Sequence, residues 1–349
     1  MNGGNSISQY EVIRQLRFPM IVLVTYAHSY GHVADGFNLL SSDWNTYEFL
    51  KLFISQTLVK VAVPVFFIMS GYLFFSNVMD WSLAVYKAKM LRRMKTLLLP
   101  YLIWNLLMAI KLKSFSWSLF WVWWKPAGIQ IDWLGHEQLM TAPANMPLWF
   151  LRDLMVISLL TPILYKGVRR FGSWLLGVLM ILYLSGVCAF IPGLSAYAVF
   201  FFTFGAFLSI KKMNLVDTMS HYEVPAYILS VLLAIAMICT YHTAVFSSLM
   251  LCFRITGAIV VFCLASRWLS HTSFRQPSLV CDSAYFVYLA HFVFFFSFID
   301  EAFFALFGIS TTGLSVHYLI CPLIKVILLV GIYAMYCRMK KMVVLPTSR

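Results

Sequence analysis

Ten apolar stretches of roughly membrane-spanning length recur along the whole sequence. They cover residues 12–32, 51–75, 96–113, 147–166, 173–191, 196–210, 224–242, 246–266, 284–305 and 314–336. A helix needs about 20 mainly apolar residues to cross the hydrocarbon core of a bilayer. Of the 349 residues, 61% are hydrophobic and 11% are charged, whereas a soluble domain carries about 25% charged residues. The pattern predicts an all-α, polytopic membrane protein with about ten transmembrane helices.

The basic residues are distributed unevenly between the connections that join these stretches. With a cytoplasmic N-terminus, the segments on the cytoplasmic side hold 18 of the 26 Lys and Arg residues, and the outside connections hold four. Cytoplasmic loops of membrane proteins carry such an excess of basic residues. We therefore predict that both termini are cytoplasmic. Because topology accounts for the net charge of +13, we expect no nucleic-acid partner.

No long polar segment separates the apolar stretches, so residues 1–349 are predicted to form a single integral-membrane domain with no appended soluble domain. The first stretch lacks the basic start and small-residue cleavage site of a signal peptide, and we expect it to be a retained helix. The seven cysteines form no CxxC pair and no metal-ligand spacing. We predict that they are buried small apolar residues, with neither disulfides nor a metal site.

Two ionisable residues, Arg17 and His28, flank the apolar centre of the first stretch. Eleven residues turn a helix through about 1,100°, which places both side chains within about 20° of one face and about 16 Å apart along the axis. Ionisable groups inside a membrane span are costly and usually mark a functional site. We predict that Arg17 lies toward the cytoplasm and His28 toward the outside, at two levels of one site.

Four further basic residues fall inside predicted spans: Lys60, Arg152, Arg254 and Lys325. The obvious acidic partner is Asp153, and an uncompensated buried cation is costly even after snorkelling. Two interpretations stay open. Each cation could cap carbonyls, snorkel or pair with a neighbouring helix, or the set could line a water-accessible cavity that binds an anionic ligand.

Five segments in sequence order carry a family signature. They are the Arg17-x10-His28 spacing, VPVFFIMSGYL at 63–73, Arg92-Arg93 leading into LPYLIW at 99–104, PLWFLRDL at 147–154 and AYFVYLAH at 284–291. These segments resemble the motifs of integral-membrane acyltransferase family three, which includes O-acetyltransferases of bacterial lipopolysaccharide and exopolysaccharide. The resemblance extends over nearly the whole chain.

The resemblance implies a ten-helix unit in the bacterial inner (cytoplasmic) membrane. This unit would transfer an acyl group, usually acetyl, from cytoplasmic acyl-CoA to a hydroxyl of a cell-surface glycan such as an exopolysaccharide, capsule or O-antigen. The implied partners are acyl-CoA, a glycan or lipid-linked glycan, and the lipid bilayer, with no tightly bound cofactor. Many relatives carry an additional span and an extracytoplasmic domain, so we expect a partner to supply any second acyl-carrying site, or none to be needed. The sequence leaves open whether the chain forms a homo-oligomer.

Acyl transfer from a thioester to a hydroxyl requires a base, stabilisation of an oxyanion and exclusion of water. His28 is predicted to deprotonate the sugar hydroxyl, with a transient acyl-histidine as the alternative. Arg17 is predicted to hold the CoA portion, because a guanidinium stays charged and binds phosphate or carbonyl oxygens bidentately. The two are the predicted catalytic residues.

The other predicted site residues would bind substrate. Arg92 and Arg93 would attract the nucleotide phosphates, although they could equally mark topology. Arg152 and Asp153 would polarise the thioester or orient His28. The segment Ser70-Gly71 has two interpretations, close helix packing or room for the pantetheine arm. The complete predicted substrate-binding set is Arg92, Arg93, Arg152, Asp153, Lys60, Ser70, Tyr72 and His291.

Alternatives remain for the whole chain and for one connection. The tryptophan-rich connection at 114–146 is predicted to form either an interfacial aromatic belt or a platform for the acceptor sugar. Buried cations and a polar path also suit a transporter of an anionic metabolite or a lipid-linked glycan. The sequence shows no inverted repeat and no matching pair of Gly/Pro-broken helices, which favours the enzyme. A sensor or scaffold has little support, because no output domain is present.

Overall fold

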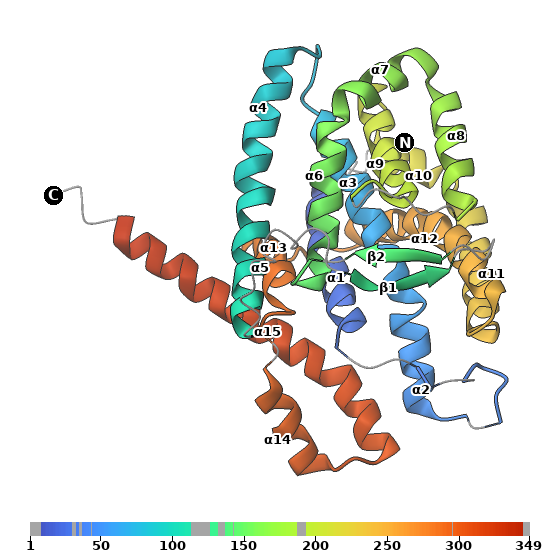
Figure 1. Cartoon of the computed structure of the whole chain (residues 1–349), viewed down its shortest axis with the longest axis vertical. Coiled ribbons are helices and arrows are strands. Elements are labelled where there is room, and N and C mark those ends of the chain that lie inside the picture. Colours follow the sequence, from blue (N-terminus) through green and yellow to red (C-terminus); the bar gives the residue numbers. More distant parts are fainter. Residues whose placement is uncertain are drawn as a thin grey trace.

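A computed structural model of the chain describes residues 8–29, 33–34, 37–42, 44–112, 126–131, 137–141, 143–186, 193–294 and 296–344. The described elements form a helical bundle, from which the C-terminal part of the last helix, α15 (Thr311–Val344), extends away (Figure 1). One antiparallel hairpin, β1 (Pro126–Ile131) and β2 (Glu137–Thr141), lies outside the helical pattern. The bundle therefore has the predicted all-α character, with two short strands added to it.

Four helical stretches are long and apolar enough to cross a membrane, by length and composition. They are Thr46–Phe75, Leu83–Lys111, Ala244–His271 and Thr311–Met342. A fifth candidate is the pair Met146–Leu159 and Thr161–Phe171, which is bent by 63°. These helices are typical of a membrane protein. The predicted total of ten spans exceeds the four or five that meet this test within the described residues, so it stays a prediction, as does the cytoplasmic position of both termini.

Each predicted apolar stretch overlaps at least one described helix. Besides α15, the helices are α1 (Gln9–Ala27), α2 (Thr46–Leu50), α3 (Ala62–Phe75), α4 (Leu83–Arg93), α5 (Leu99–Lys111), α6 (Trp149–Leu159), α7 (Thr161–Phe171), α8 (Ser173–Leu184), α9 (Ala196–Ile210), α10 (Leu215–Ser220), α11 (Glu223–Cys239), α12 (Ala244–His271), α13 (Ser278–Ala290) and α14 (Ser297–Phe307). Short irregular helical turns extend three of these helices: η1 (Lys51–Ser55) and η2 (Leu58–Val61) before α3, η3 (Met94–Leu98) before α5 and η5 (Met146–Leu148) before α6.

Two predicted stretches, 147–166 and 284–305, are broken into two helices each, so the prediction of one helix in each stretch was wrong. The first bends between α6 and α7 next to Pro162, which lacks an N–H group and disfavours helical geometry in the preceding residue. The second breaks between α13 and α14, where Phe296 has a positive φ of 40°. His291 therefore lies just after the end of a helix instead of inside one.

Helix α1 lies at the centre of the bundle and packs against α3, α12, α13 and α15. At its start, the backbone N–H of Leu215 in α10 donates to the Gln9 side chain at 2.8 Å. At its end, the Ser55 hydroxyl donates to the Tyr26 carbonyl at 3.1 Å. Arg17 therefore lies nearer the end of α1 that contacts α10, and His28 lies at the other end of α1, beside η1.

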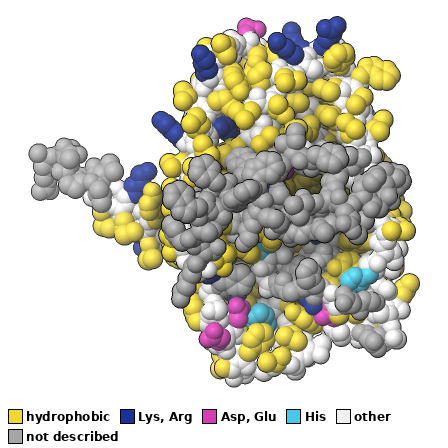
Figure 2. Space-filling view, viewed as in Figure 1, with side chains coloured by type: hydrophobic (Ala, Val, Ile, Leu, Met, Phe, Trp, Pro, Cys, Tyr) yellow, Lys and Arg dark blue, Asp and Glu magenta, His cyan; other side chains and the backbone are white. Residues whose placement is uncertain are grey.

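Basic side chains gather at one end of the molecular surface. Figure 2 shows Lys and Arg side chains at the end where α7 and the start of α4 lie, with acidic side chains mostly at the other end. The last turn of α7 contains Arg169 and Arg170. This end is the one predicted to face the cytoplasm.

Helices α3 and α9 approach each other closely through two glycines. A Cβ atom at Gly71 would lie 2.0 Å from the carbonyl oxygen of Phe202, and one at Gly205 would lie 2.0 Å from the carbonyl oxygen of Ile68. Neither position can hold a side chain at this helix separation. Gly71 thus serves helix packing, as one of the two interpretations of the Ser70-Gly71 segment predicts.

We expect Gly71→Ala to destabilise the folded protein, because the new methyl group must push α9 away from α3. Overpacking of this kind costs about 1–3 kcal/mol, and occasionally more. The measurement is the thermal unfolding temperature of purified protein in detergent, together with its level in the membrane. The control is Gly177→Ala in α8, where an added Cβ meets no atom within 4 Å. Equal stability of the two variants would contradict the close α3–α9 contact.

Candidate active site

A cavity of about 300 Å³, the large cavity, lies between α1, α3, α6, α13 and the α4–η3 junction. Four residues of the α1 segment line it: Arg17, Ile21, Val24 and His28. Their spacings of four, three and four residues place them on one face of the helix. Arg17 and His28 thus share a face as their separation predicts, and the large cavity extends along α1 from one to the other.

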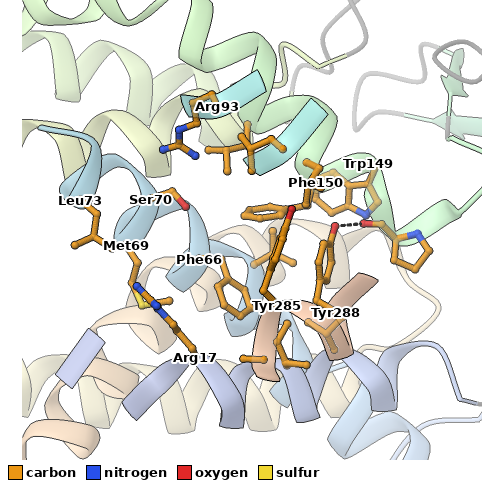
Figure 3. Close-up of a pocket in the computed structure, with 18 of the residues that line it drawn as sticks. Arg17, Phe66, Met69, Ser70, Leu73, Arg93, Trp149, Phe150, Tyr285 and Tyr288 are labelled. Carbon is orange, nitrogen blue, oxygen red and sulfur yellow. Dashed lines mark hydrogen bonds between the residues drawn. The ribbon is translucent and has the colours of Figure 1, made fainter. Parts of the chain in front are cut away.

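The opposite walls come from segments that are distant in the sequence. Helix α3 contributes a stripe that includes Phe66 and Ser70, and α13 contributes Tyr285 and Tyr288. Figure 3 shows Arg17 approaching from α1 and Arg93 from α4, with Ser70 between them. The Tyr288 hydroxyl donates to the Pro147 carbonyl at 2.7 Å (Figure 3), which ties α13 to the start of α6. The walls are mainly apolar.

The charged groups of the large cavity are cationic. Arg17 is exposed and forms no hydrogen bond or ion pair with a described residue. The guanidinium of Arg93 lies 5.3 Å from the ring centre of Phe74, a cation–π contact that leaves its N–H groups available to a ligand. No carboxylate is present among the described lining residues. The large cavity therefore suits a ligand that carries negative charge or carbonyl oxygens.

His28 caps the end of α1, and its ring lies beside the ring of His291, with 5.5 Å between the centroids. The His28 imidazole forms no hydrogen bond with a described residue. Nδ1 of His291 lies 2.8 Å from the Tyr288 carbonyl oxygen, which can only accept, so this nitrogen carries a proton and donates it. Nε2 of His291 is buried and has no hydrogen-bond partner among the described groups. The two predicted histidines are thus brought together, although only His28 lines the large cavity.

Arg152 and Asp153 lie on α6 but do not line the large cavity. The lining residues of that helix are Trp149, Phe150, Leu151 and Leu154. Arg152 and Asp153 are both buried, and Nε and Nη2 of Arg152 lie 3.1 and 3.0 Å from Oδ1 of Asp153. The hydroxyl of Ser195 donates to the other carboxylate oxygen at 3.3 Å. The pair ties α6 to the start of α9, and its predicted contact with substrate stays a prediction.

Three more predicted binding residues also do not line the large cavity. The hydroxyl of Tyr72 donates to the Met213 carbonyl at 3.4 Å, and Arg92 is exposed on α4. Lys60 lies in η2 and forms no hydrogen bond or ion pair with a described residue. Their roles in binding stay predictions.

One buried cation has an acidic partner that the sequence did not indicate. Lys325 has an acidic partner other than Asp153, since its ammonium nitrogen lies 2.7 and 2.8 Å from the two oxygens of Asp300. The break in the predicted ninth span brings α14 back against α15, where the two residues meet. Arg254 lies over the ring of Tyr197 at 4.8 Å. Among the described residues, no carboxylate pairs with Arg254 or Lys60.

Sequence reasoning did not select the aromatic residues that wall the large cavity, although the motifs contain them. They include Phe66, Trp149, Phe150, Tyr285 and Tyr288. The stripe at 63, 66, 70 and 73 has helical spacing and could have indicated which face of α3 points inward. Most of the connection at 114–146, with its predicted belt or platform, lies outside the described residues.

Comparison with known proteins identifies the family of the chain. Residues 11–335 match the family described as "Acyltransferase domain". A stretch of 134 residues is 31% identical to the succinoglycan biosynthesis protein ExoH of Rhizobium meliloti (strain 1021). The alignment covers 36% of this chain and 34% of that relative, so about a third of its length is represented. No solved structure matches the chain.

Proposed function

The chain belongs to the acyltransferase family, and from that premise we propose that it transfers an acyl group, such as acetyl, from cytoplasmic acyl-CoA to a hydroxyl of a cell-surface glycan. The observation that carries the proposal is the presence of Arg17, Arg93 and His28 on the wall of one cavity. Two guanidinium groups and an imidazole supply anion binding and proton transfer, which the reaction requires together.

The large cavity suits the pantetheine arm of acyl-CoA better than the whole acyl-CoA molecule. A volume of about 300 Å³ is at the lower end of the range of about 300–1,000 Å³ for small-ligand sites. The mainly apolar walls suit the thin pantetheine arm with its thioester, and Arg17 binds polar oxygens of that arm. The nucleotide phosphates then remain near Arg93, at the basic end of the molecule. CoA is a substrate in this scheme, and the chain needs no tightly bound cofactor.

The transfer itself is a nucleophilic substitution at the thioester carbonyl. The acceptor hydroxyl oxygen attacks the carbonyl carbon while the imidazole of His28 takes the hydroxyl proton. The tetrahedral oxyanion forms in a cavity whose described charged lining groups are cationic, so the potential of the cavity favours its negative charge. The carbon–sulfur bond then breaks, the sulfur leaves with the electron pair, and the proton held by His28 passes to it, which gives free CoA and returns the imidazole to its neutral form. An ester on the glycan is the other product.

The acceptor side of the proposal rests on His28 and on the relative. His28 lies at the end of α1 that is opposite the basic end, which places the base near the outer face if the basic end is cytoplasmic. The relative's name refers to succinoglycan biosynthesis, so a polysaccharide is the acceptor class that we propose. We further propose a bacterial inner-membrane location with about ten spans and both termini in the cytoplasm.

Arg93 and Arg92 are expected to differ in their effect on the donor. Arg93 lines the large cavity and Arg92 does not. Arg93→Gln is therefore expected to raise the KM for acyl-CoA by about tenfold, which is the effect of losing one hydrogen bond to a charged group. Arg92→Gln, the adjacent exposed control, is expected to raise it by less than about threefold, as a screened surface charge does. Initial rates of CoA release at varied acyl-CoA measure both. Equal increases for the two variants would indicate a diffuse charge effect instead of a site.

Surface-glycan analysis tests the proposed function in cells. Mass spectrometry of the glycan from cells with and without the protein identifies the ester and its position together. We expect the ester to disappear, with the sugar backbone still present at the surface. If the whole glycan is lost from the surface while the glycan that remains in the cell keeps its ester content, a transporter is favoured.

A further inference from the structure

A second cavity, the small cavity, lies on the other side of His28. It has a volume of about 20 Å³ and lies where the ends of α1 and α13 meet α15. His28, Ser29, His291 and Lys325 are among its polar lining residues. His28 lines both cavities and therefore lies between them. A polar space of at least about 10–15 Å³ holds one water molecule when two to four polar groups surround it.

His291, which lines the small cavity, has a buried acceptor without a described partner. Its Nδ1 donates to the Tyr288 carbonyl at 2.8 Å, so in the neutral ring Nε2 carries a lone pair. That nitrogen is buried and has no partner among the described residues. A buried acceptor without a donor is costly, and native structures nearly always satisfy such a group with protein or ordered water.

Lys325 lines the small cavity and is held in place by Asp300. Its ammonium nitrogen lies 2.7 and 2.8 Å from the two oxygens of Asp300 in α14, and Nε2 of His317 lies 2.8 Å from one of them. Cys321 lies close enough to Asp300 and His317 for the three to form a metal-ligand group. The carboxylate charge is already neutralised by Lys325, however, and we assign the cluster to holding that lysine in place.

We propose that the small cavity holds one ordered water that donates to Nε2 of His291 and accepts from Lys325 and from a ring N–H of His28. The inference rests on the proposed function, because it explains how His28 is prepared to act as the base. When one ring nitrogen of His28 donates to this water, the other carries the lone pair and can face the large cavity. Lys325 is then a positioning residue that acts on the reaction through the water and His28.

Variants of Lys325 test this assignment by separating turnover from donor binding. We expect Lys325→Met to lower kcat for CoA release by about 10–100-fold, as loss of a hydrogen bond from a charged donor does, with an unchanged KM for acyl-CoA. Lys325→Arg keeps a cationic donor and is expected to retain most of kcat. Lys340→Met, at an exposed position near the end of the same helix, is the control.

The double variant Asp300→Asn/Lys325→Met keeps the test valid if the single variant fails to fold, since it removes both charges of the pair together. A folded double variant with native kcat would overturn the inference. Native protein that releases no CoA would contradict the proposed function instead, and a map that resolves ordered water then decides the inference by itself. We expect a water bonded to Nε2 of His291. A side chain that fills the small cavity, or an Nε2 bonded directly to protein, would overturn the proposal.

Discussion

Replacing His28 with alanine is expected to abolish ester formation on the glycan and to lower kcat for CoA release by about 100- to 10,000-fold, the range typical for loss of a general base. His28 lines the large cavity and is bonded to no described side chain, so its ring nitrogens are available to substrate and water. The fold is expected to survive, because the imidazole contributes ring contacts to His291 and Phe292 but no hydrogen bond between described elements. Thiol release and ester formation by purified protein measure the effect.

A histidine outside the site provides the matched control. His271 is the last residue of α12 and is exposed, so His271→Ala should leave kcat within about twofold of native, as surface substitutions do. The His28 variant must also reach the membrane at the native level. Full glycan acylation by His28→Ala would remove His28 from the reaction and leave His291 as the imidazole to examine next.

Replacing Arg17 with alanine is expected to raise the KM for acyl-CoA by about 10–100-fold, because a hydrogen bond to a charged group contributes about 1.5–3 kcal/mol. Arg17 lies at the opposite end of the large cavity from His28, where it would bind polar oxygens of the donor arm. The kcat at saturating donor is expected to change less than the KM if Arg17 binds the ground state and the transition state equally. Arg17→Lys should be intermediate, since an ammonium cannot bind oxygens bidentately.

The control for this variant lies one turn earlier on the same helix. Arg14 is 3.8 Å from Glu11 and does not line the large cavity, so Arg14→Ala is expected to bind acyl-CoA with native affinity. Titration of purified protein with acyl-CoA compares the two variants directly. Equal affinity of the Arg17 and Arg14 variants would contradict the donor-binding role of Arg17.

The sequence predicted those parts of the site that follow from the period of one helix. The separation of Arg17 and His28 is enough to place both on one face of α1, and both do line the large cavity. The sequence also predicted Arg93, together with Arg92, as a cation near the membrane boundary that attracts phosphates. Its position on the cavity wall, apart from exposed Arg92, could not be predicted, because it depends on how α4 packs against α3 and α6.

The contacts between distant segments were beyond the sequence for a physical reason. An apolar stretch such as 284–305 does not show where it breaks, since apolar residues suit one long helix or two short ones. The break after Ala290 places His291 beside His28 and returns Asp300 to Lys325. The sequence also does not show how closely α3 and α9 approach, because this distance depends on the pairing of Gly71 in one helix with Gly205 in the other.

The most direct test of the central claim is a thiol-release measurement with purified protein, acyl-CoA and the surface glycan from cells that lack the protein. The account predicts that CoA appears when the glycan is present, with one thiol formed for each new ester. It also predicts that this release is lost in the His28 variant and is restored in the Arg17 variant by excess donor. Movement of glycan across a vesicle membrane without thiol release would contradict the account and would favour a transporter.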